Sequence, residues 1–168
     1  MLASGDAPEE RKRLEVHKLD ALLGFCESTA CRHQIILRYF GEEHPGNCAQ
    51  CDNCLEPIDT WDATQAARMA LSCVYRTGQR FGVGHLIDVL LGKATAQVEK
   101  FHHQQLSTFG IGQALAQAQW SSVYRQLVAA GLLNVDMEAY GGLRLTEQAS
   151  PVLRGESDVW LRRDAEPA

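Results

Sequence analysis

The feature that most constrains this chain is a group of cysteines at fixed spacing. Cys48, Cys51 and Cys54 form a CxxCxxC motif, and sixteen residues without a cysteine separate it from Cys31. Gaps of two residues let one turn direct neighbouring sulfur atoms toward the same ion, and a distant fourth sulfur completes a tetrahedron. The spacing predicts one Zn²⁺ ion bound by these four residues. Four thiolates leave no open position for water, so the expected role of the ion is structural.

An iron–sulfur cluster is an alternative to zinc at these cysteines, because it also takes four cysteine ligands. Unligated thiols are disfavoured because three of them in one exposed loop oxidise readily. Disulfides are disfavoured because no signal-peptide pattern opens the sequence and the cytoplasm is reducing. The two remaining cysteines, Cys26 and Cys73, fall on apolar helical faces and are interpreted as small core residues.

Helical periodicity lies on both sides of the first of these four cysteines. Leucines at near-helical intervals predict a helix over about 8–27. A second helix is predicted over about 31–40, ending at Gly41, because glycine accepts the left-handed backbone common at helix ends. Residues 42–57 lose this periodicity and are rich in turn-forming residues, which predicts a loop. Such a loop is ordered only if a metal holds it. Residues 1–57 are therefore expected to form a helical zinc-binding domain.

Short helices and then a hairpin are predicted in the second part of the chain. The expected helices cover about 63–77, 85–92, 95–106 and 119–130. The last has the clearest pattern, with apolar residues at i, i+3, i+4, i+7 and i+8: Trp120, Val123, Tyr124, Leu127 and Val128. Beyond Gly131 the period changes to two, so LLNVDM and LRLT predict a β-hairpin with EAYGG as its turn. Helices followed by a terminal hairpin describe a winged helix.

The predicted fold class is mainly α with a small β-hairpin wing. A helical-hairpin zinc-binding subdomain precedes a winged-helix domain of the helix-turn-helix type. The expected boundaries are a linker over 58–62, a winged-helix DNA-binding domain over 63–155 and a C-terminal tail over 156–168. The 168 residues, 45% of them hydrophobic, suffice for one medium core or two small ones.

Net charge and hydropathy limit the function classes. The formal net charge is −5, and four thiolates around one divalent ion add about two negative charges. Any DNA contact must therefore come from local cationic patches. The longest apolar stretches, such as LIDVLL over 86–91, are far shorter than the roughly 20 residues that a membrane span requires. The expected location is cytoplasmic.

Several motifs resemble the C-terminal region of bacterial RecQ-family DNA helicases. They are CRHQIILRYFGE with the cysteine spacing, QRFGVG, STFGIG, RQLVAAGLL and PVLRGE, in the family's order. The resemblance covers about residues 13–156. It implies a zinc platform and a winged helix within a nucleoid-associated, ATP-dependent helicase that unwinds DNA 3′ to 5′ in repair, recombination and replication.

The resemblance also implies what this chain lacks. It contains no GxxxxGK[ST] phosphate-binding loop, and GKAT over 92–95 has no upstream glycine at the required spacing. No catalytic residue is therefore expected here. ATP and Mg²⁺ would belong to motor lobes elsewhere in the parent helicase, so the chain is expected to be an inactive fragment by itself.

Contacts to duplex, fork or partial-duplex DNA are implied through the phosphate backbone. The candidate residues are Arg80, Lys93, Thr95, Lys100, His102, His103 and Arg144, together with Tyr140 at the hairpin tip, whose ring would stack on a base. Two arginines usual in the family are replaced here by Leu91 and Gln97. The resemblance therefore predicts weak and strongly salt-dependent binding.

A competing hypothesis treats the winged helix as a protein-docking surface. Bacterial relatives are expected to bind the acidic, hydrophobic-ended tail of single-stranded DNA-binding protein. Arg76 and Arg154 match basic positions of that pocket, where a guanidinium forks onto a carboxylate. Ser150 stands where a third arginine is expected, which weakens the pocket. A zinc-bearing transcription factor is a further alternative, although no segment resembles a dimerisation element.

Overall fold

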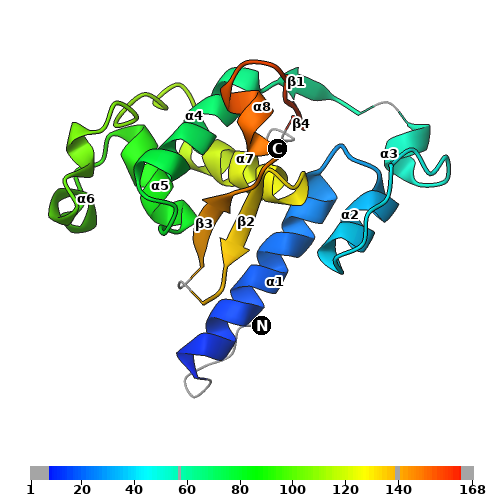
Figure 1. Ribbon diagram of the computed structural model, residues 1–168, viewed down its shortest axis with the longest axis horizontal. Helices are drawn as coiled ribbons and strands as arrows, with labels where there is room; N and C mark the ends of the chain where they lie inside the picture. Colours follow the sequence, from blue (N-terminus) through cyan, green and yellow to red (C-terminus); the bar gives the residue numbers. More distant parts are fainter. Residues whose placement is uncertain (1–7, 57, 139–140, 164–168) are drawn as a thin grey trace.

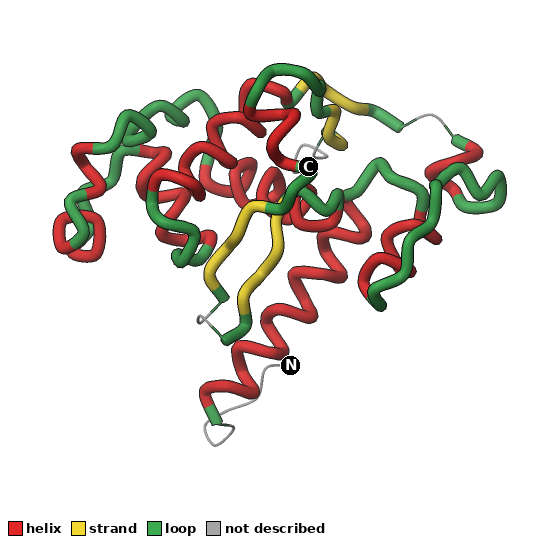
Figure 2. Tube along the Cα trace, in the orientation of Figure 1, coloured by secondary structure: helices red, strands yellow, loops and turns green. Residues whose placement is uncertain are grey.

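The computed structural model describes residues 8–56, 58–138 and 141–163 (Figure 1; Figure 2). Within these ranges, none of the helices has both the length and the hydrophobicity needed to cross a membrane. The mainly helical fold with one small hairpin wing agrees with the predicted fold class. The cysteine loop and the segment around residue 100 lie at opposite ends of the long axis (Figure 1).

A helical hairpin forms the N-terminal part of the described chain. Helices α1 (Glu9–Glu27) and α2 (Arg32–Tyr39) agree closely with the two predicted ones, and Gly41 adopts the expected left-handed conformation with φ of 82°. The predicted loop contains one short helix, α3 (Asp52–Leu55). Its turn closes on Cys51, whose carbonyl accepts from the N–H groups of Cys54 and Leu55, both at 3.1 Å.

The second unit contains the predicted helices and hairpin. Its elements are α4 (Thr64–Arg76), α5 (Val83–Leu91), α6 (Ala96–Lys100), η1 (His103–Gln105), α7 (Gln117–Ala129), β2 (Leu133–Asp136), β3 (Gly142–Leu145) and α8 (Ala149–Leu153). The hairpin is antiparallel, with Leu133 opposite Leu145 and Val135 opposite Leu143. Helix α8 was not predicted.

The helix predicted over 95–106 is wrong in its second half. Helix α6 ends at Lys100, and His102 takes a left-handed backbone with φ of 57° before the 3₁₀ turn η1 begins. This bend places the next side chain, His103, inside the domain, where its ring packs against Phe81 and His85. A continuous helix would have no such bend. The break in the helix at His102 therefore allows the His103 ring to be buried.

The core lies between α4, α5, α7 and the hairpin. Trp120 and Tyr124 are fully buried, and each satisfies its polar atom on a backbone carbonyl. The Trp120 Nε1–H donates to Gly112 at 2.7 Å, and the Tyr124 hydroxyl donates to Ala70 at 3.3 Å. Cys73 is buried in this core, as predicted, and burial raises the pKa of its thiol to about 12.

The interpretation of Cys26 as a core residue is wrong, since its side chain is exposed on α1. The leucines of the same helix are also exposed, and Leu22 retains 57% of its surface. Helix α1 instead contacts α7 through Gly24, where a β-carbon would lie 2.9 Å from the Arg125 carbonyl oxygen. Helical spacing identified an apolar helix, but the packing of α1 leaves its leucine face uncovered among the described residues.

A second small sheet joins the segments predicted as linker and tail. Strand β1 (Thr60–Asp62) pairs antiparallel with β4 (Trp160–Arg162), with Trp61 opposite Leu161. The Asp62 carboxylate accepts from the Thr64 N–H at 3.1 Å, next to the start of α4. Strands of three residues carry almost no periodic signal. The sequence therefore did not predict this pairing.

Candidate metal centre and nucleic-acid interface

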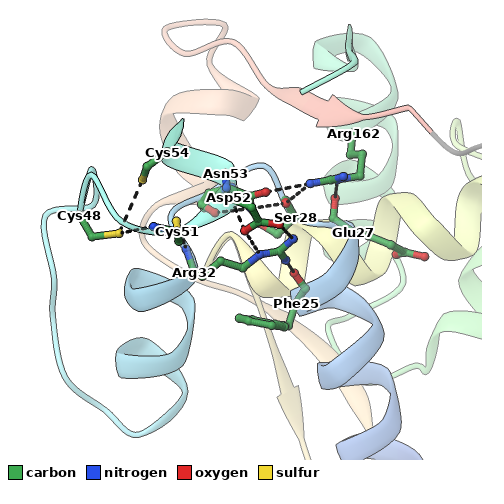
Figure 3. A network of polar contacts seen from close by, with 11 residues as sticks. Phe25, Glu27, Ser28, Arg32, Cys48, Cys51, Asp52, Asn53, Cys54 and Arg162 are labelled. Atoms are coloured by element: carbon green, nitrogen blue, oxygen red, sulfur yellow. Dashed lines mark hydrogen bonds and ion pairs between the residues drawn. The ribbon is translucent and has the colours of Figure 1, made fainter. Parts of the chain in front are cut away.

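The four cysteines predicted to bind one ion lie together. Their Sγ atoms are all within 4.8 Å of one another, and those of Cys48 and Cys54 are 3.9 Å apart. Ligands 2.3 Å from a tetrahedral zinc have sulfur atoms about 3.8 Å apart. The cluster is therefore compatible with one Zn²⁺ ion. Cys31 immediately precedes α2, while the other three come from the loop and α3 (Figure 3).

Backbone N–H groups point at the sulfur atoms. The Arg32 N–H donates to the Cys51 sulfur at 3.5 Å, and the Cys51 N–H donates to the Cys48 sulfur at 3.3 Å. Such donors favour the thiolate form that binds a metal. The loop accommodates this geometry by bending sharply, and Asn47 and Ala49 both adopt positive φ angles of 49° and 56°.

The protonation of the cluster indicates a site suited to a cation. Burial raises the pKa of Cys31, but hydrogen bonds from the backbone of Gln34 and Cys48 outweigh it and bring this pKa down to about 6. Burial and a hydrogen bond with Cys51 raise the pKa of Cys54 to about 11. Neighbouring thiolates repel one another, so Cys54 keeps its proton near neutral pH when no cation is bound. A divalent ion removes that repulsion.

Polar contacts anchor the loop to the helical hairpin (Figure 3). Arg32 forms a bidentate ion pair with Asp52, with its Nε and Nη2 atoms 2.9 and 3.0 Å from the two carboxylate oxygens. The same guanidinium donates to the Phe25 carbonyl and lies 4.9 Å from the Phe25 ring centroid. Hydrogen bonding by Arg32 lowers the pKa of Asp52 to about 2. The carboxylate therefore stays ionised over the whole neutral range.

Helix α7 directly precedes the wing, as a recognition helix does. However, α1 and the core of the domain cover it. Its single charged residue is Arg125, which forks onto both carboxylate oxygens of Glu27 at 3.0 and 2.6 Å. Helix α1 lies along α7 at Gly24, and the α7 side chains Trp120 and Tyr124 are core residues. This helix therefore has no unpaired cation to offer to a DNA groove.

Cationic side chains gather around an aromatic pair between α4 and α6. The Arg80 guanidinium lies 5.2 Å from the Phe81 ring centroid and 5.1 Å from that of Phe101. The Lys100 ammonium lies 5.4 Å from the same Phe101 ring. Neither cation forms an ion pair with any carboxylate in the part of the chain that the structure describes. We call Arg80, Lys100, Phe81 and Phe101 the cationic platform.

The hairpin is fixed directly against the cationic platform. The Leu143 N–H donates to the Phe81 carbonyl at 3.0 Å, and the Leu145 N–H donates to the Gln79 side chain at 3.0 Å. Gly142 permits this approach, because a β-carbon there would lie 2.6 Å from the Arg80 carbonyl carbon and oxygen. The wing and Arg80 therefore have a fixed relative position.

His103, predicted as a DNA contact, is buried. Its Nδ1 lies 2.7 Å from the Nε2 of His85, and it stacks beside Phe101 at 5.8 Å. Burial lowers the pKa of both histidines; the His103 charge adds to the effect on His85, and the Arg80 charge adds to that on His103. The structure therefore does not support a phosphate contact from the His103 ring. It gives this residue a packing role behind the cationic platform, while the preceding His102 is exposed.

The other candidate DNA contacts have diverse surroundings. Lys93 lies 4.0 Å from Asp88, and the Thr95 hydroxyl caps α6 by accepting from the Val98 N–H at 3.2 Å. Arg144 pairs with Asp136 at 2.8 Å on the wing, although its side chain remains 59% exposed. Exposed pairs of this kind are weak, so both cations remain available to phosphate. Tyr140 lies outside the described residues.

The candidate docking arginines are both exposed. Arg76 is the last residue of α4 and Arg154 follows α8, two helices that pack together. A third exposed arginine, Arg68, was not predicted; its Nη1 would lie 4.0 Å from a β-carbon at Gly155. Among the described residues, none of the three has an ion-pair partner. The sequence positions of Arg68 and Gly155 do not indicate that the two residues are neighbours.

Comparison with known proteins agrees with this arrangement. A family model described as RecQ zinc-binding matches residues 1–55, and one described as RQC domain matches residues 57–168. The chain is 40% identical to an "ATP-dependent DNA helicase RecQ" of Pasteurella multocida over 158 residues, which are 93% of this chain and 25% of that protein. The corresponding helicase of Haemophilus influenzae is 39% identical, covering 93% of this chain and 26% of the relative.

A more distant relative matches a similar share of the chain. The "ATP-dependent DNA helicase RecQ" of Bacillus subtilis is 31% identical over 94% of this chain and 26% of its own length. The chain thus spans about a quarter of the curated relatives that it matches. These matches, with which the four-sulfur cluster agrees, show that the chain belongs to the RecQ family, of which it represents the zinc-binding and RQC region.

Proposed function

We propose that the chain is the DNA-binding portion of an ATP-dependent DNA helicase that unwinds duplex in the 3′ to 5′ direction. Its relatives are named ATP-dependent DNA helicases and the chain spans about a quarter of their length, and both observations support this proposal. ATP hydrolysis with Mg²⁺ belongs to the parent protein outside this region. We place that parent in the bacterial cytoplasm, at the nucleoid, with roles in repair, recombination and replication.

The observation that carries the proposal is the cationic platform beside the wing. Arg80 and Lys100 are exposed cations held over aromatic rings, and the wing strand β3 is hydrogen-bonded to the same segment. Aromatic rings restrict the rotamers of such cations, so less side-chain entropy is lost when a phosphate binds. Contacts of this type position a duplex without reading its sequence.

Because α7 is buried, we infer that the protein contacts the phosphate backbone of DNA and does not insert this helix into a groove. A helix-turn-helix protein ordinarily inserts the helix before the wing into the major groove. Here α1 covers that helix, and its one arginine is paired with Glu27. We infer that duplex or fork DNA lies across the cationic platform and the wing, with Arg144, His102 and Lys93 as further contacts. We retain Tyr140 as a candidate for stacking on a base at the wing tip.

We also propose a division of the chain into two domains. Residues 1–57 form the zinc-binding domain and residues 63–155 the winged helix, while the zinc ion, when bound, supplies a fixed tetrahedral crosslink between the loop and the start of α2. The α1 helix then holds α7 from the side opposite the core. The cysteine loop and α6 lie at opposite ends of the molecule (Figure 1), so we propose that the metal centre acts as a support and not as a DNA contact.

Salt-dependent DNA binding tests the proposed function. Replacing both Arg80 and Lys100 by alanine is expected to weaken binding to a labelled partial duplex and to reduce the slope of log K against log salt by about two, one unit per lost phosphate contact. The measurement is fluorescence anisotropy at increasing NaCl. Arg163→Ala is the control, because Arg163 is an exposed cation on the β1–β4 side of the molecule. An unchanged slope in the double variant contradicts binding at the cationic platform.

A second candidate function is docking of an acidic protein tail. We propose that Arg76 and Arg154, together with Arg68, receive the C-terminal tail of single-stranded DNA-binding protein, whose terminal carboxylate suits a guanidinium fork. The packing of α4 against α8 and the lack of described carboxylate partners for these arginines support it.

A tail-peptide titration distinguishes docking from DNA binding. Arg154→Ala is expected to weaken binding of a fluorescent tail peptide at least tenfold while leaving duplex affinity unchanged, because a charge-assisted bidentate contact contributes about 1.5–3 kcal/mol. Arg144→Ala on the wing serves as the control for the peptide. Equal losses of peptide and duplex binding in Arg154→Ala indicate a single shared site and contradict separate docking.

A further inference from the structure

Asn53 connects the metal loop to two other parts of the molecule. It lies between the ligands Cys51 and Cys54, and its Nδ2 donates to the carbonyls of Ser28 at 2.9 Å and Ala30 at 2.8 Å. Its Oδ1 accepts from the Arg162 Nη2 at 2.9 Å. Both protons and the oxygen of this amide are therefore used, and Figure 3 shows them bridging the loop, the end of α1 and strand β4.

Arg162 extends the connection into the winged helix. Its Nε donates to the Glu27 carbonyl at 3.1 Å and its Nη2 to the Ser28 carbonyl at 3.4 Å. Carbonyl groups at the end of a helix lack intrahelical partners and attract a cation. The Arg162 backbone is held by Gln126, whose Oε1 accepts from the Arg162 N–H at 2.8 Å and whose Nε2 donates to its carbonyl at 3.2 Å.

Gln126 is a buried residue of α7, only 2% exposed. Its amide is fixed further by a hydrogen bond to Ser122 Oγ at 3.1 Å. An unbroken series of hydrogen bonds thus runs from the metal loop through Asn53 and Arg162 to the core of the winged helix. Asn53 precedes both Gln126 and Arg162 by more than 70 positions in the sequence, and the connection does not pass through the segment that joins the two units.

The position of Asn53 depends on the sulfur cluster. The loop has little core of its own: Cys48, Cys51 and Cys54 are only partly buried, and Leu55 is 64% exposed. A loop with so little buried apolar surface does not offset its own ordering entropy. We infer that Asn53 and Arg162 form a latch through which metal bound at the four cysteines also holds strand β4 against α7.

Hydrogen exchange on the whole chain tests the latch. Removing zinc from the wild-type protein with a chelator is expected to lower the protection of the Arg162 amide about tenfold or more, in addition to the loss of protection in residues 29–56. Asn53→Ala is expected to give the same low protection of Arg162 while zinc is still bound. Gln50→Ala, an exposed amide side chain in the same loop, is the matched control and should behave as wild type.

Two exchange results overturn the latch. One is a chelated wild-type protein in which residues 160–163 keep full protection. The other is zinc-bound Asn53→Ala in which the Arg162 amide is as protected as in wild type. Neither readout involves DNA, so the result is independent of the proposed function.

Zinc affinity provides a reciprocal test. If bound metal stabilises the latch by some factor, the latch must tighten metal binding by the same factor. Arg162→Ala is therefore expected to weaken zinc binding by about tenfold in competition with a chromogenic chelator, a change within the usual range of coupling energies. Arg163→Ala is the control, because the Arg163 side chain pairs with Asp59 at 3.5 Å and does not reach the loop. Equal zinc affinity in Arg162→Ala and wild type contradicts the coupling.

Discussion

Replacing Cys51 by serine is expected to release the metal and to unfold residues 29–56. Structural zinc contributes roughly 10–16 kcal/mol of binding free energy in zinc-finger peptides, which exceeds what this small, weakly buried segment supplies by itself. Helix α1 is expected to stay folded, because Gly24 packs on α7 and Glu27 pairs with Arg125. Elemental analysis measures the metal, and hydrogen exchange maps the unfolded residues.

A second cysteine variant controls for the loss of a thiol. Cys26→Ser removes an exposed sulfur outside the cluster and is expected to keep stoichiometric zinc and wild-type exchange. A Cys51→Ser protein that retains one zinc per chain and full protection of residues 29–56 contradicts the structural assignment of the metal.

The substitution Gly142→Ala is expected to give the largest effect in the winged helix. Its β-carbon would meet the carbonyl carbon and oxygen of Arg80 at 2.6 Å, and backbone atoms cannot move aside as the end of a flexible side chain can. Strand β3 must then shift away from the Arg80–Phe81 segment. Overpacking of this kind costs about 1–3 kcal/mol, so the urea midpoint should fall, and duplex affinity should fall with it.

Gly84→Ala is the matched control for this prediction. Gly84 lies in α5 with no neighbouring heavy atom within 4 Å of an added β-carbon. Alanine there should leave stability unchanged or raise it by up to about 1 kcal/mol, because alanine has the higher helix propensity. Equal urea midpoints for Gly142→Ala and wild type, within error, contradict the close contact between wing and Arg80.

The charge distribution is compatible with the DNA contact proposed for this acidic chain. The formal net charge is −5, yet α6, which ends at Lys100, lies at one end of the molecule, while α3 of the cysteine loop lies at the other (Figure 1). Screening over about 10 Å at 0.1 M salt largely separates these regions. Local charge, rather than net charge, therefore governs the proposed contact.

Much of the architecture was predictable from local sequence patterns. The spacing of Cys31, Cys48, Cys51 and Cys54 predicted the sulfur cluster, since gaps of two residues let one turn direct neighbouring sulfur atoms toward the same ion. Helical periodicity predicted α1, α2, α4, α5 and α7 to within a few residues, and the change to a period of two predicted the hairpin. These signals arise from interactions between residues close in sequence, so a single sequence contains them.

Other features were decided only by the tertiary structure. The pairing of β1 with β4, the burial of His103, the exposure of Cys26 and the covering of α7 by α1 all depend on contacts between distant segments. The Asn53–Arg162 contact joins residues 109 positions apart. Short strands and single polar side chains leave no periodic pattern, so the sequence determined where the longer helices, the hairpin and the metal site form, whereas packing determined which faces remain exposed.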